Sequence, residues 1–349
     1  MFRDISFPEV LEKQEKENHT LIDVRSPKEY EEATIPGSVN IPVFTDEERA
    51  EVGTLYKQVG KKAAKQRGLE IMSAKLPEFI TRFQEIDTPK TVFCWRGGMR
   101  SKTAATLVDL MGADVNRLTG GYRSYRQWVV SFLEKEDFKP ELLVLNGNTG
   151  SGKTILLKRL ADEGYPVMDL EGMANHRGSI FGQIGLNPSN QKKFDSLLVD
   201  NLLRFQESRF VFVEGESRRI GRITIPEFLY RKKEQGIQLF IELPVEERIN
   251  NILEDYQPWN SPKRFMEAFQ LIRRKIHTPI AKEIESALTE GHYRNAVKLL
   301  LEYYYDPRYE HAADQYPEER KVHLQANTMD EAYQLVVDWC NSRKLTSLT

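Results

Sequence analysis

Short apolar runs separated by amphipathic stretches dominate the hydrophobic pattern in the first part of the chain. The runs Thr20–Val24 and Thr91–Cys94 are apolar and partly β-branched, which is typical of buried strands. After the second run, apolar residues recur at helical spacing over Ser101–Met111. Gly112 then suits the left-handed position just past a helix end. The pattern predicts a strand, a loop and a helix, with Cys94 at the carboxyl end of the strand.

The second part of the chain alternates in the same way before it becomes helical. The apolar run Leu142–Leu145 leads into a glycine-rich loop, and a helical pattern follows at Ile155–Glu163. Further strands are predicted at 166–170, 209–213 and 238–243. From about Glu246 onwards the pattern is helical. Because alternating strands and helices favour parallel sheets, we expect the α/β class with a helical C-terminal part.

Length and composition support two domains. The chain has 349 residues, which is more than one hydrophobic core usually serves. Apolar residues make up 40% and charged residues 29%, which are ordinary globular values. The charged stretch Glu134–Glu141 marks the boundary. We therefore expect one domain over residues 1–133 and a second over 134–349.

Charge and hydropathy exclude several classes of protein. The net charge of −2 argues against a uniformly basic nucleic-acid-binding protein, so local basic patches must hold any polyanion. No apolar run approaches the roughly 20 residues that a membrane helix needs. The N-terminus MFRDISFPEV has the character of neither a secretory signal nor a transit peptide. We expect a cytoplasmic protein with no membrane partner, and a monomer, since no heptad pattern or long apolar edge argues for a dimer.

The loop Cys94–Ser101 combines a thiol with the features of an anion-binding site. Gly97 and Gly98 allow a tight turn whose N–H groups point inward, next to the start of a helix. Arg96 and Arg100 add positive charge. This environment favours a thiolate, which can attack sulfur, selenium or phosphorus. The alternative, a cysteine that only ends a buried strand, leaves these glycines and arginines unexplained. Cys94 is the candidate catalytic residue, and its anion loop comprises Arg96, Gly97, Gly98, Arg100 and Ser101.

A second anion-binding motif occupies Gly147–Thr154. It reads GNTGSGKT, which is the full G-x-x-x-x-G-K-[ST] pattern between a predicted strand and a predicted helix. Glycines let the backbone close around phosphate oxygens, Lys153 neutralises phosphate charge, and the Thr154 hydroxyl can ligate Mg²⁺. The predicted phosphate-binding residues are Gly147, Gly150, Ser151, Gly152, Lys153 and Thr154.

Polar residues after the later strands are further candidates for this site. Glutamate stands where a P-loop protein often has aspartate, which weakens the case for conventional nucleotide hydrolysis. The candidates are Asp169, His176, Arg177, Glu214 and Glu216. Neither the histidines nor the two cysteines have metal-ligand spacing, so no tightly bound metal is expected. Cys340 lies in an apolar-periodic stretch and is predicted to be a buried packing residue.

Basic clusters in the second domain could follow a phosphodiester backbone. The candidates are Arg218, Arg219, Arg222, Arg273, Arg274 and Arg308. A solvated surface is the alternative for each cluster. Tyr303–Tyr305 lie close to the last arginine and could stack on RNA bases, although core packing is the favoured alternative for most of them.

Several motifs of the first domain resemble rhodanese-like domains. Leu21–Tyr30 (LIDVRSPKEY) and Ile35–Pro42 (IPGSVNIP) are similar to the first half of such a domain, and Leu118–Tyr122 (LTGGY) is similar to the second. The resemblance implies that Cys94 carries a chalcogen, as a persulfide or its selenium analogue. Five residues separate Cys94 from Arg100, which is the spacing of cysteine phosphatases. This spacing favours a cradle enlarged for a tetrahedral anion.

The two domains together resemble the tRNA 2-selenouridine synthase family, and the likeness extends to residues 45–50, 174–178 and 303–308. The resemblance implies a transferase that replaces the sulfur of 2-thiouridine at the tRNA wobble base with selenium. It implies selenophosphate as the donor and an S-geranyl-2-thiouridine intermediate made with geranyl diphosphate. The implied partner is the anticodon region of tRNA. These substrates take the place of a tightly bound cofactor, with Mg²⁺ as an accompanying ion.

The implied chemistry assigns a role to each loop. We expect Lys153 and the surrounding N–H groups to stabilise departing pyrophosphate, and Cys94 to carry selenium as a selenyl-sulfide. Three other functions stay open. One is an NTP-dependent tRNA sulfurtransferase that uses a Cys94 persulfide. The second is a nucleotide-gated binding module with Cys94 as a redox sensor. The third is a cysteine phosphatase, although Phe93 replaces the histidine that precedes the cysteine in that class.

Overall fold

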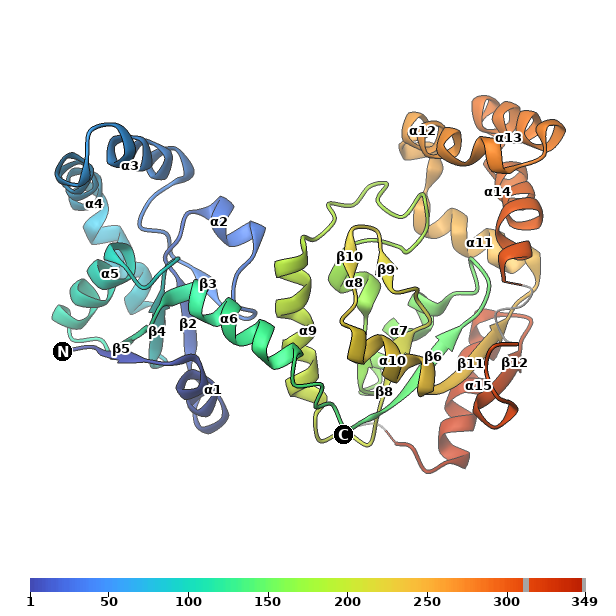
Figure 1. Cartoon of the computed structure of the whole chain (residues 1–349), viewed down its shortest axis with the longest axis horizontal. Coiled ribbons are helices and arrows are strands. Elements are labelled where there is room, and N and C mark those ends of the chain that lie inside the picture. The colour runs from blue at the N-terminus through green and yellow to red at the C-terminus, as the bar shows by residue number, and fades with distance from the viewer. Residues whose placement is uncertain (310–313, 347–349) are drawn as a thin grey trace. The chain divides into compact units, whose positions relative to one another are not determined.

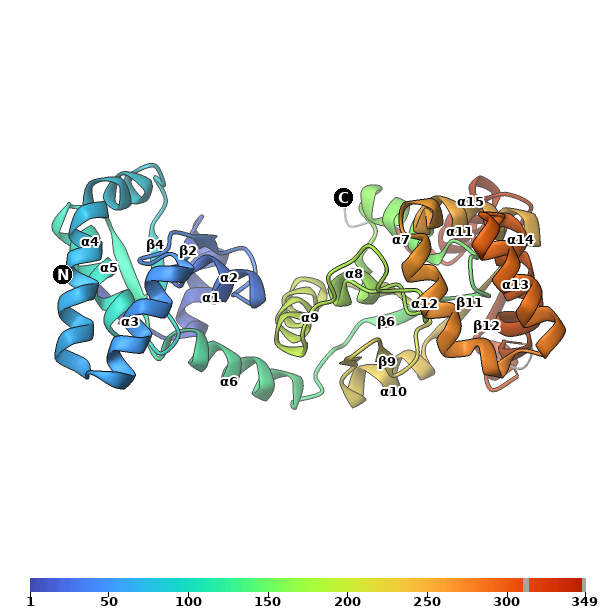
Figure 2. The same ribbon diagram turned by 90° about the horizontal axis from the view of Figure 1, so that it is seen from above.

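The computed structural model describes residues 1–309 and 314–346. It divides into two compact units (Figures 1 and 2). The first contains Met1–Lys135 together with Asp195–Asp200, and the second contains Glu136–Phe194 and Asn201–Thr349. The main boundary therefore lies close to the one expected after residue 133. The inclusion of a short segment from later in the chain was not expected.

The first unit is built on a parallel sheet with the strand order β1-β5-β4-β2-β3. Apolar clusters cover both faces, one around Phe83 and Val92 and the other around Phe93 and Tyr122. Its strands are β1 (Arg3–Ile5), β2 (Thr20–Asp23), β3 (Val39–Asn40), β4 (Lys90–Phe93) and β5 (Val115–Leu118). Its helices are α1 (Phe7–Lys16), α2 (Pro27–Glu32), α3 (Asp46–Gln58), α4 (Lys61–Gln84), α5 (Met99–Leu110) and α6 (Gly121–Leu133).

The elements that position Cys94 agree with the sequence pattern. Strand β4 ends at Phe93, so Cys94 is the first residue past it, and α5 begins at Met99. The strand β1 was not predicted, because three residues are too few to show an alternating pattern. It gains its place by pairing in register with β5, which is a tertiary effect.

The second unit contains a parallel sheet with the order β12-β11-β6-β8-β7 and a small antiparallel pair. Its strands are β6 (Glu141–Asn146), β7 (Val167–Met168), β8 (Phe210–Glu214), β9 (Arg219–Ile220), β10 (Ile223–Thr224), β11 (Ile237–Glu242) and β12 (Lys321–Gln325). Its α-helices are α7 (Lys153–Asp162), α8 (Leu170–Ala174), α10 (Glu227–Gln235), α11 (Val245–Tyr256), α12 (Pro262–Ile272), α13 (Thr278–Glu290), α14 (Tyr293–Leu300) and α15 (Met329–Ser342). The helix α9 (Gln191–Phe205) is divided, because its middle part, Asp195–Asp200, belongs to the first unit. The α/β class is confirmed in both units.

The prediction that the chain is helical beyond Glu246 is wrong at β12. This strand pairs in parallel with β11 at the edge of the sheet. Its sequence KVHLQ has only Leu324 fully buried, because an edge strand can leave most of its side chains partly exposed. Its hydrophobic signal is therefore too weak to separate it from the helices around it. Cys340 lies buried in α15, as predicted.

The helices α11 to α14 form a group with its own apolar core. Figure 2 shows α12, α13 and α14 gathered together, and α11 packs against α14. Phe269, Ile284 and Ala296 are all buried in this core. The chain then passes through a π-helical turn at Leu301–Tyr305. In the described part of the chain, no helix is long and apolar enough to cross a membrane.

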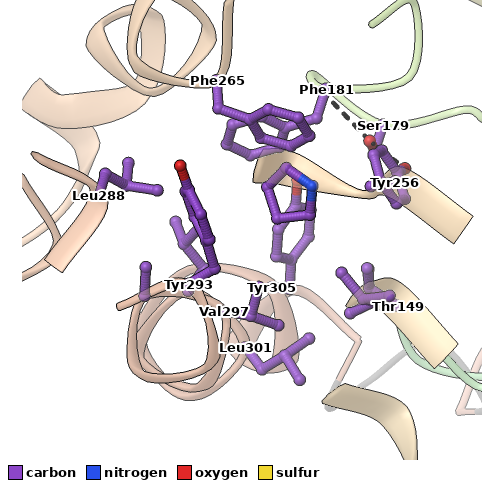
Figure 3. Close-up of a pocket in the computed structure, with 14 residues that line it drawn as sticks. Thr149, Ser179, Phe181, Tyr256, Phe265, Leu288, Tyr293, Val297, Leu301 and Tyr305 are labelled. Carbon is purple, nitrogen blue, oxygen red and sulfur yellow. Dashed lines mark hydrogen bonds between the residues drawn. The ribbon is translucent and has the colours of Figure 1, made fainter. Parts of the chain in front are cut away.

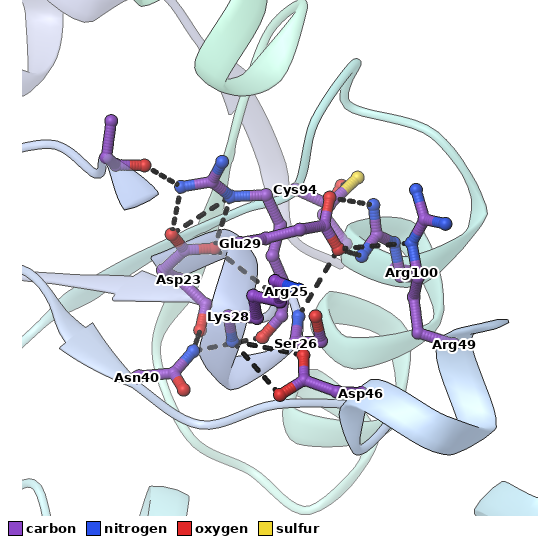
Figure 4. A network of polar contacts seen from close by, with 12 residues as sticks. Asp23, Arg25, Ser26, Lys28, Glu29, Asn40, Asp46, Arg49, Cys94 and Arg100 are labelled. Carbon is purple, nitrogen blue, oxygen red and sulfur yellow. Dashed lines mark hydrogen bonds and ion pairs between the residues drawn. The ribbon is translucent and has the colours of Figure 1, made fainter. Parts of the chain in front are cut away.

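A buried ion pair anchors the loop that follows β2 (Figure 4). Arg25 is only 2% exposed, and its Nη2 lies 2.6 Å from Oδ2 of Asp23, which is fully buried. The same guanidinium nitrogen donates to the Ala33 carbonyl oxygen at 2.7 Å. Its charge also lies 4.3 Å from the centroid of the Tyr122 ring. Nε and Nη2 of the buried arginine therefore both meet hydrogen-bond acceptors, and its charge is paired, as a buried charge requires.

We expect Arg25→Met to destabilise the first unit by about 3–5 kcal/mol, because it leaves the Asp23 carboxylate buried without its counter-charge. Denaturant unfolding of the full chain measures the change. Arg3→Met is the matched control, since Arg3 is exposed on β1, and it should shift the free energy of unfolding by less than about 0.5 kcal/mol. Equal unfolding midpoints for the two variants would contradict the expectation.

Candidate active site

Cys94 lies where the parallel sheet of the first unit presents the carboxyl ends of its strands. The residue follows β4 directly, and its side chain is 3% exposed. Its Sγ lies 3.2 Å from Oγ of Ser101, within hydrogen-bonding distance. Ser101 in turn donates to the Gly98 carbonyl oxygen at 3.4 Å. Two of the predicted anion-loop residues thus contact each other around the thiol.

The start of α6 closes the Cys94 loop from the opposite side. The Tyr122 N–H donates to the Cys94 carbonyl oxygen at 2.8 Å, and the Arg123 N–H donates to that of Trp95 at 2.9 Å. Gly121 has φ +62°, and a Cβ there would collide with the Cys94 carbonyl oxygen. Only glycine fits this close approach. The Leu118–Tyr122 motif is therefore part of the cradle.

The loop keeps backbone donors available. Within the described residues, the N–H groups of Arg96, Gly97 and Gly98 donate to no backbone carbonyl oxygen. Gly97 has φ +62°, which turns the chain as a nest of N–H groups requires. Arg96 itself is exposed, so its side chain projects from the loop toward solvent. The backbone supplies the cradle, and the arginines surround it.

Arg100 does not stand alone beside the thiol. Its guanidinium forms an ion pair with Glu29, and Arg49 lies 3.7 Å from the same carboxylate (Figure 4). Burial by itself would raise the pKa of Glu29, but the ion pair with Arg100 holds that pKa below its usual value. The carboxylate is therefore ionised, and it orients two arginines at the rim of the Cys94 loop.

Sequence reasoning missed both Glu29 and Arg49. Arg49 sits in the first turns of α3, where Thr45 and Glu48 form a capping box: Thr45 Oγ1 accepts from the Glu48 N–H at 3.3 Å. The stretch 45–50 was noted only for its resemblance to a family. The T-x-x-E pattern was the available signal, because it indicates a helix start that places an arginine at a defined position.

The P-loop of the second unit connects β6 to α7, as predicted. Lys153 is the first residue of α7, and its Nζ donates to the Gly147 carbonyl oxygen at 3.1 Å. The lysine therefore folds back across the loop that it follows. Ser151 is 1% exposed, and its N–H donates to the Asn148 carbonyl oxygen at 3.0 Å. The loop is thus compact, with the lysine side chain positioned over it.

Two buried side chains of α11 hold the P-loop in place. Arg248 donates from Nε to the Thr149 carbonyl oxygen at 2.9 Å, and Asn251 donates to that of Gly150 at 2.9 Å. Arg248 also forms an ion pair with Asp306 at 2.6 Å. Asn148 donates to the same aspartate at 3.3 Å. Sequence reasoning missed this set, since no motif connects residues so far apart along the chain.

A second carboxyl group beside the P-loop is that of Glu171, which was not predicted. Thr154 donates from Oγ1 to Glu171 Oε2 at 3.2 Å. Burial and the neighbouring Glu216 raise the pKa of Glu171 to about 8, so the group is largely protonated at neutral pH. The predicted candidate Glu216 therefore lies near Glu171.

Asp169 and Glu214 serve local structure. Asp169 caps α8 by accepting from the Gly172 N–H at 2.6 Å. Glu214 is fully buried and accepts from the Leu170 N–H at 2.9 Å. Burial and the nearby Asp169 carboxylate raise the pKa of Glu214 well above its usual value. Across residues 1–309 and 314–346, no group of three or more His, Cys, Asp or Glu side chains is arranged to hold a metal ion.

His176 and Arg177 shape the loop after α8. The His176 Nδ1 accepts from the Gly178 N–H at 3.1 Å, and burial lowers the pKa of the ring. Arg177 lies 2.9 Å from the Asp255 carboxylate, and its guanidinium is 4.8 Å from the centroid of the Tyr256 ring. These contacts fasten the loop to α11.

The predicted phosphodiester contacts divide into two kinds. Arg218 pairs with Glu227 at 2.8 Å, and Arg273 pairs with Glu285 at 3.1 Å. The Arg308 guanidinium lies 3.6 Å from the centroid of the Tyr304 ring. Arg219, Arg222 and Arg274 form no ion pair with another described residue, and these three arginines are exposed, as are Arg218 and Arg308.

Comparison with known proteins accounts for both units. A model described as the tRNA 2-selenouridine synthase AAA domain matches residues 140–346, and a rhodanese-like domain model matches 6–127. The tRNA 2-selenouridine synthase of Nitrosomonas europaea is 31% identical, with 83% of this chain and 88% of the relative covered. That of Bdellovibrio bacteriovorus is also 31% identical, with 86% and 91% covered. The chain therefore belongs to the tRNA 2-selenouridine synthase family.

Proposed function

We propose that this protein converts 2-thiouridine at the wobble position of tRNA into 2-selenouridine through an S-geranyl-2-thiouridine intermediate. Geranyl diphosphate supplies the geranyl group, and selenophosphate supplies selenium. The observation that carries the proposal is the presence of a cysteine cradle and a P-loop in one chain of this family. The relatives' name supports tRNA selenation, and the two loops support two different anionic substrates.

In the first step, the P-loop binds the diphosphate of geranyl diphosphate. The 2-thiouridine sulfur attacks the allylic carbon, a C–S bond forms, the C–O bond breaks, and pyrophosphate leaves. The base loses its N3 proton to solvent. Lys153, folded across the loop by its bond to Gly147, neutralises charge that develops on the departing oxygen. Alkylation turns the sulfur into a neutral thiol leaving group for the next step.

In the second step, the Cys94 loop binds selenophosphate. Selenium in selenophosphate is already at the selenide level, so a selenyl-sulfide on Cys94 would require an oxidant. We therefore infer attack by the Cys94 thiolate on phosphorus instead. An S–P bond forms, the P–Se bond breaks, and hydroselenide is released. Hydroselenide displaces geranylthiol from the base, and water then hydrolyses the phosphocysteine. The five-residue spacing to Arg100 supports a tetrahedral phosphorus at this position.

We expect Cys94→Ala to accumulate geranylated tRNA and to form no selenouridine, because the P-loop step does not use the thiol. Mass spectrometry of thiolated tRNA incubated with geranyl diphosphate and then selenophosphate measures both products. Cys340→Ala is the control, since that cysteine is buried in α15, and it should complete both steps. Selenouridine formation by the Cys94 variant at the normal rate would refute the role of the thiol.

We expect Lys153→Ala to slow geranylation by about 100- to 1,000-fold, the usual cost of removing one preorganised group that stabilises developing charge. Selenation of tRNA that is already geranylated should stay unchanged. Lys158→Ala, on the exposed side of the same helix, is the control and should leave both rates unchanged. Single-turnover assays without ATP measure the rates. Normal geranylation by Lys153→Ala would assign the P-loop another ligand.

The raised pKa of Glu171 predicts a pH dependence. Below about pH 8 the carboxyl group is protonated, and above it the carboxylate places a negative charge beside Thr154 and the bound diphosphate. In Mg²⁺-free buffer, affinity for geranyl diphosphate should fall as the pH rises through that value. Glu171→Gln should remove the decline, whereas Glu267→Gln, at an exposed position on α12, should keep it. Calorimetric titration measures the affinity for geranyl diphosphate at each pH. An unchanged decline of that affinity in Glu171→Gln would contradict the assignment of the pH dependence to Glu171.

A further inference from the structure

A pocket in the second unit opens beside the P-loop. Its empty space is about 540 Å³ when the open solvent at its mouth is counted. Thr149 of the P-loop forms part of its wall, and Tyr256 from α11 and Phe265 from α12 form others. Val297 from α14 and Leu301 from the π-helical turn line it as well (Figure 3). The pocket therefore lies between the phosphate loop and the helical group.

The lining is mostly apolar, and among its buried side chains the Tyr305 hydroxyl has no hydrogen-bond partner within the described residues. The hydroxyls of Ser179 and Tyr256 bond to each other at 2.8 Å. The Thr149 carbonyl oxygen already accepts from Arg248. Burial raises the pKa of both Tyr256 and Tyr305, so their hydroxyls stay neutral. Apart from the Tyr305 hydroxyl, a purine or pyrimidine in this pocket would find few partners to replace its hydrogen bonds to water, which argues against a nucleoside.

Aromatic rings build the pocket wall that Figure 3 shows at its top. Phe181 and Phe265 stack with their centroids 5.6 Å apart and their planes at 19°. Tyr256 meets Phe265 edge-on at 6.2 Å. The opposite wall includes Leu301 and Tyr305, from a π-helical turn of a kind that recurs at functional sites. Such a surface suits a flexible unsaturated hydrocarbon.

Because Thr149 of the P-loop lines the pocket, the polar end of a ligand is expected to lie in the P-loop. Arg248 bonds to Thr149 and to Asp306, so the loop and the helical group are held together at the pocket mouth. A ligand with its diphosphate in Gly147–Thr154 can therefore extend an apolar tail past Thr149. We propose that this pocket binds the hydrocarbon tail of an allylic prenyl diphosphate and selects its chain length. This inference rests on the proposed function, because it takes the P-loop to hold a diphosphate.

The test compares chain-length selectivity in two variants with opposite effects on space. Val297→Phe narrows the pocket, and Tyr293→Ala widens it from the same helix. Val130→Phe, the same exchange at an exposed position on α6, is the matched control. Calorimetry on the full chain measures binding of dimethylallyl, geranyl and farnesyl diphosphates, and of inorganic pyrophosphate as the probe for the loop alone.

We expect Val297→Phe to weaken geranyl diphosphate binding by at least about tenfold, equivalent to about 1.4 kcal/mol, with pyrophosphate affinity unchanged. Tyr293→Ala should shift preference toward farnesyl diphosphate. Retained pyrophosphate binding in both variants also demonstrates that they fold. If one variant loses pyrophosphate binding, the chain-length preference of the other variant tests the pocket assignment.

The outcomes separate this inference from the proposed function. Unchanged chain-length preference in both variants would overturn the pocket assignment and leave geranyl transfer standing. Pocket-dependent binding of geranyl diphosphate without geranylation of thiolated tRNA would support the pocket and overturn the proposed reaction. A wild-type protein that binds pyrophosphate and geranyl diphosphate equally would also overturn the pocket assignment.

Discussion

Both anion loops depend on a neighbouring element that approaches their backbone more closely than a side chain permits. In the first unit, Gly121 lies against the Cys94 carbonyl oxygen, where a Cβ would collide. In the second, a Cβ on Gly150 would lie 2.7 Å from the Arg248 carbonyl oxygen. Both glycines have positive φ. The close approach lets α6 and α11 bond directly to the loop backbones, so each loop is rigid before a ligand binds.

The contact between α11 and the P-loop also explains how a phosphate loop comes to border an apolar pocket. Arg248 is 4% exposed, and its charge needs partners. It finds them in Thr149 of the loop and in Asp306, which follows the π-helical turn. These bonds hold the helical group against the loop. The apolar core of that group therefore ends at the phosphate site, and its open part forms the pocket.

The sequence predicted what is encoded within a few consecutive residues. Cys94 with its glycines, and Gly147–Thr154, depend on local turns, so their positions between strand and helix could be deduced. The roles of Glu171 and Arg248 could not be deduced from the sequence, because each depends on a contact made only in the folded chain. Glu171 accepts a hydrogen bond from Thr154, and Arg248 donates one to the Thr149 carbonyl oxygen. A sequence contains no spacing rule for such pairs.

The edge strand β12 illustrates the same limit for the fold. Its register with β11 buries Leu324, whereas Lys321 and Val322 are partly exposed and His323 is exposed. Periodicity reports burial on a face, and an edge strand buries too little of its surface to produce a clear period. The helical prediction failed there because tertiary pairing, and not local preference, determines the conformation.

The Cys94 loop and the pocket beside the P-loop offer opposite environments, and the proposed chemistry uses that difference. The Cys94 loop is polar, with Arg100, Arg49 and Glu29 at its rim. The pocket at Thr149 is almost wholly apolar. A thiolate is a better nucleophile than the sulfur of a thiouridine, so a prenyl diphosphate bound beside Cys94 would alkylate the enzyme. Binding the electrophile in the second unit, next to side chains that carry no nucleophilic thiol, removes that side reaction. Under the proposed function, the fusion of the two units would keep the alkylating substrate and the reactive cysteine in separate sites while a single chain acts on one base.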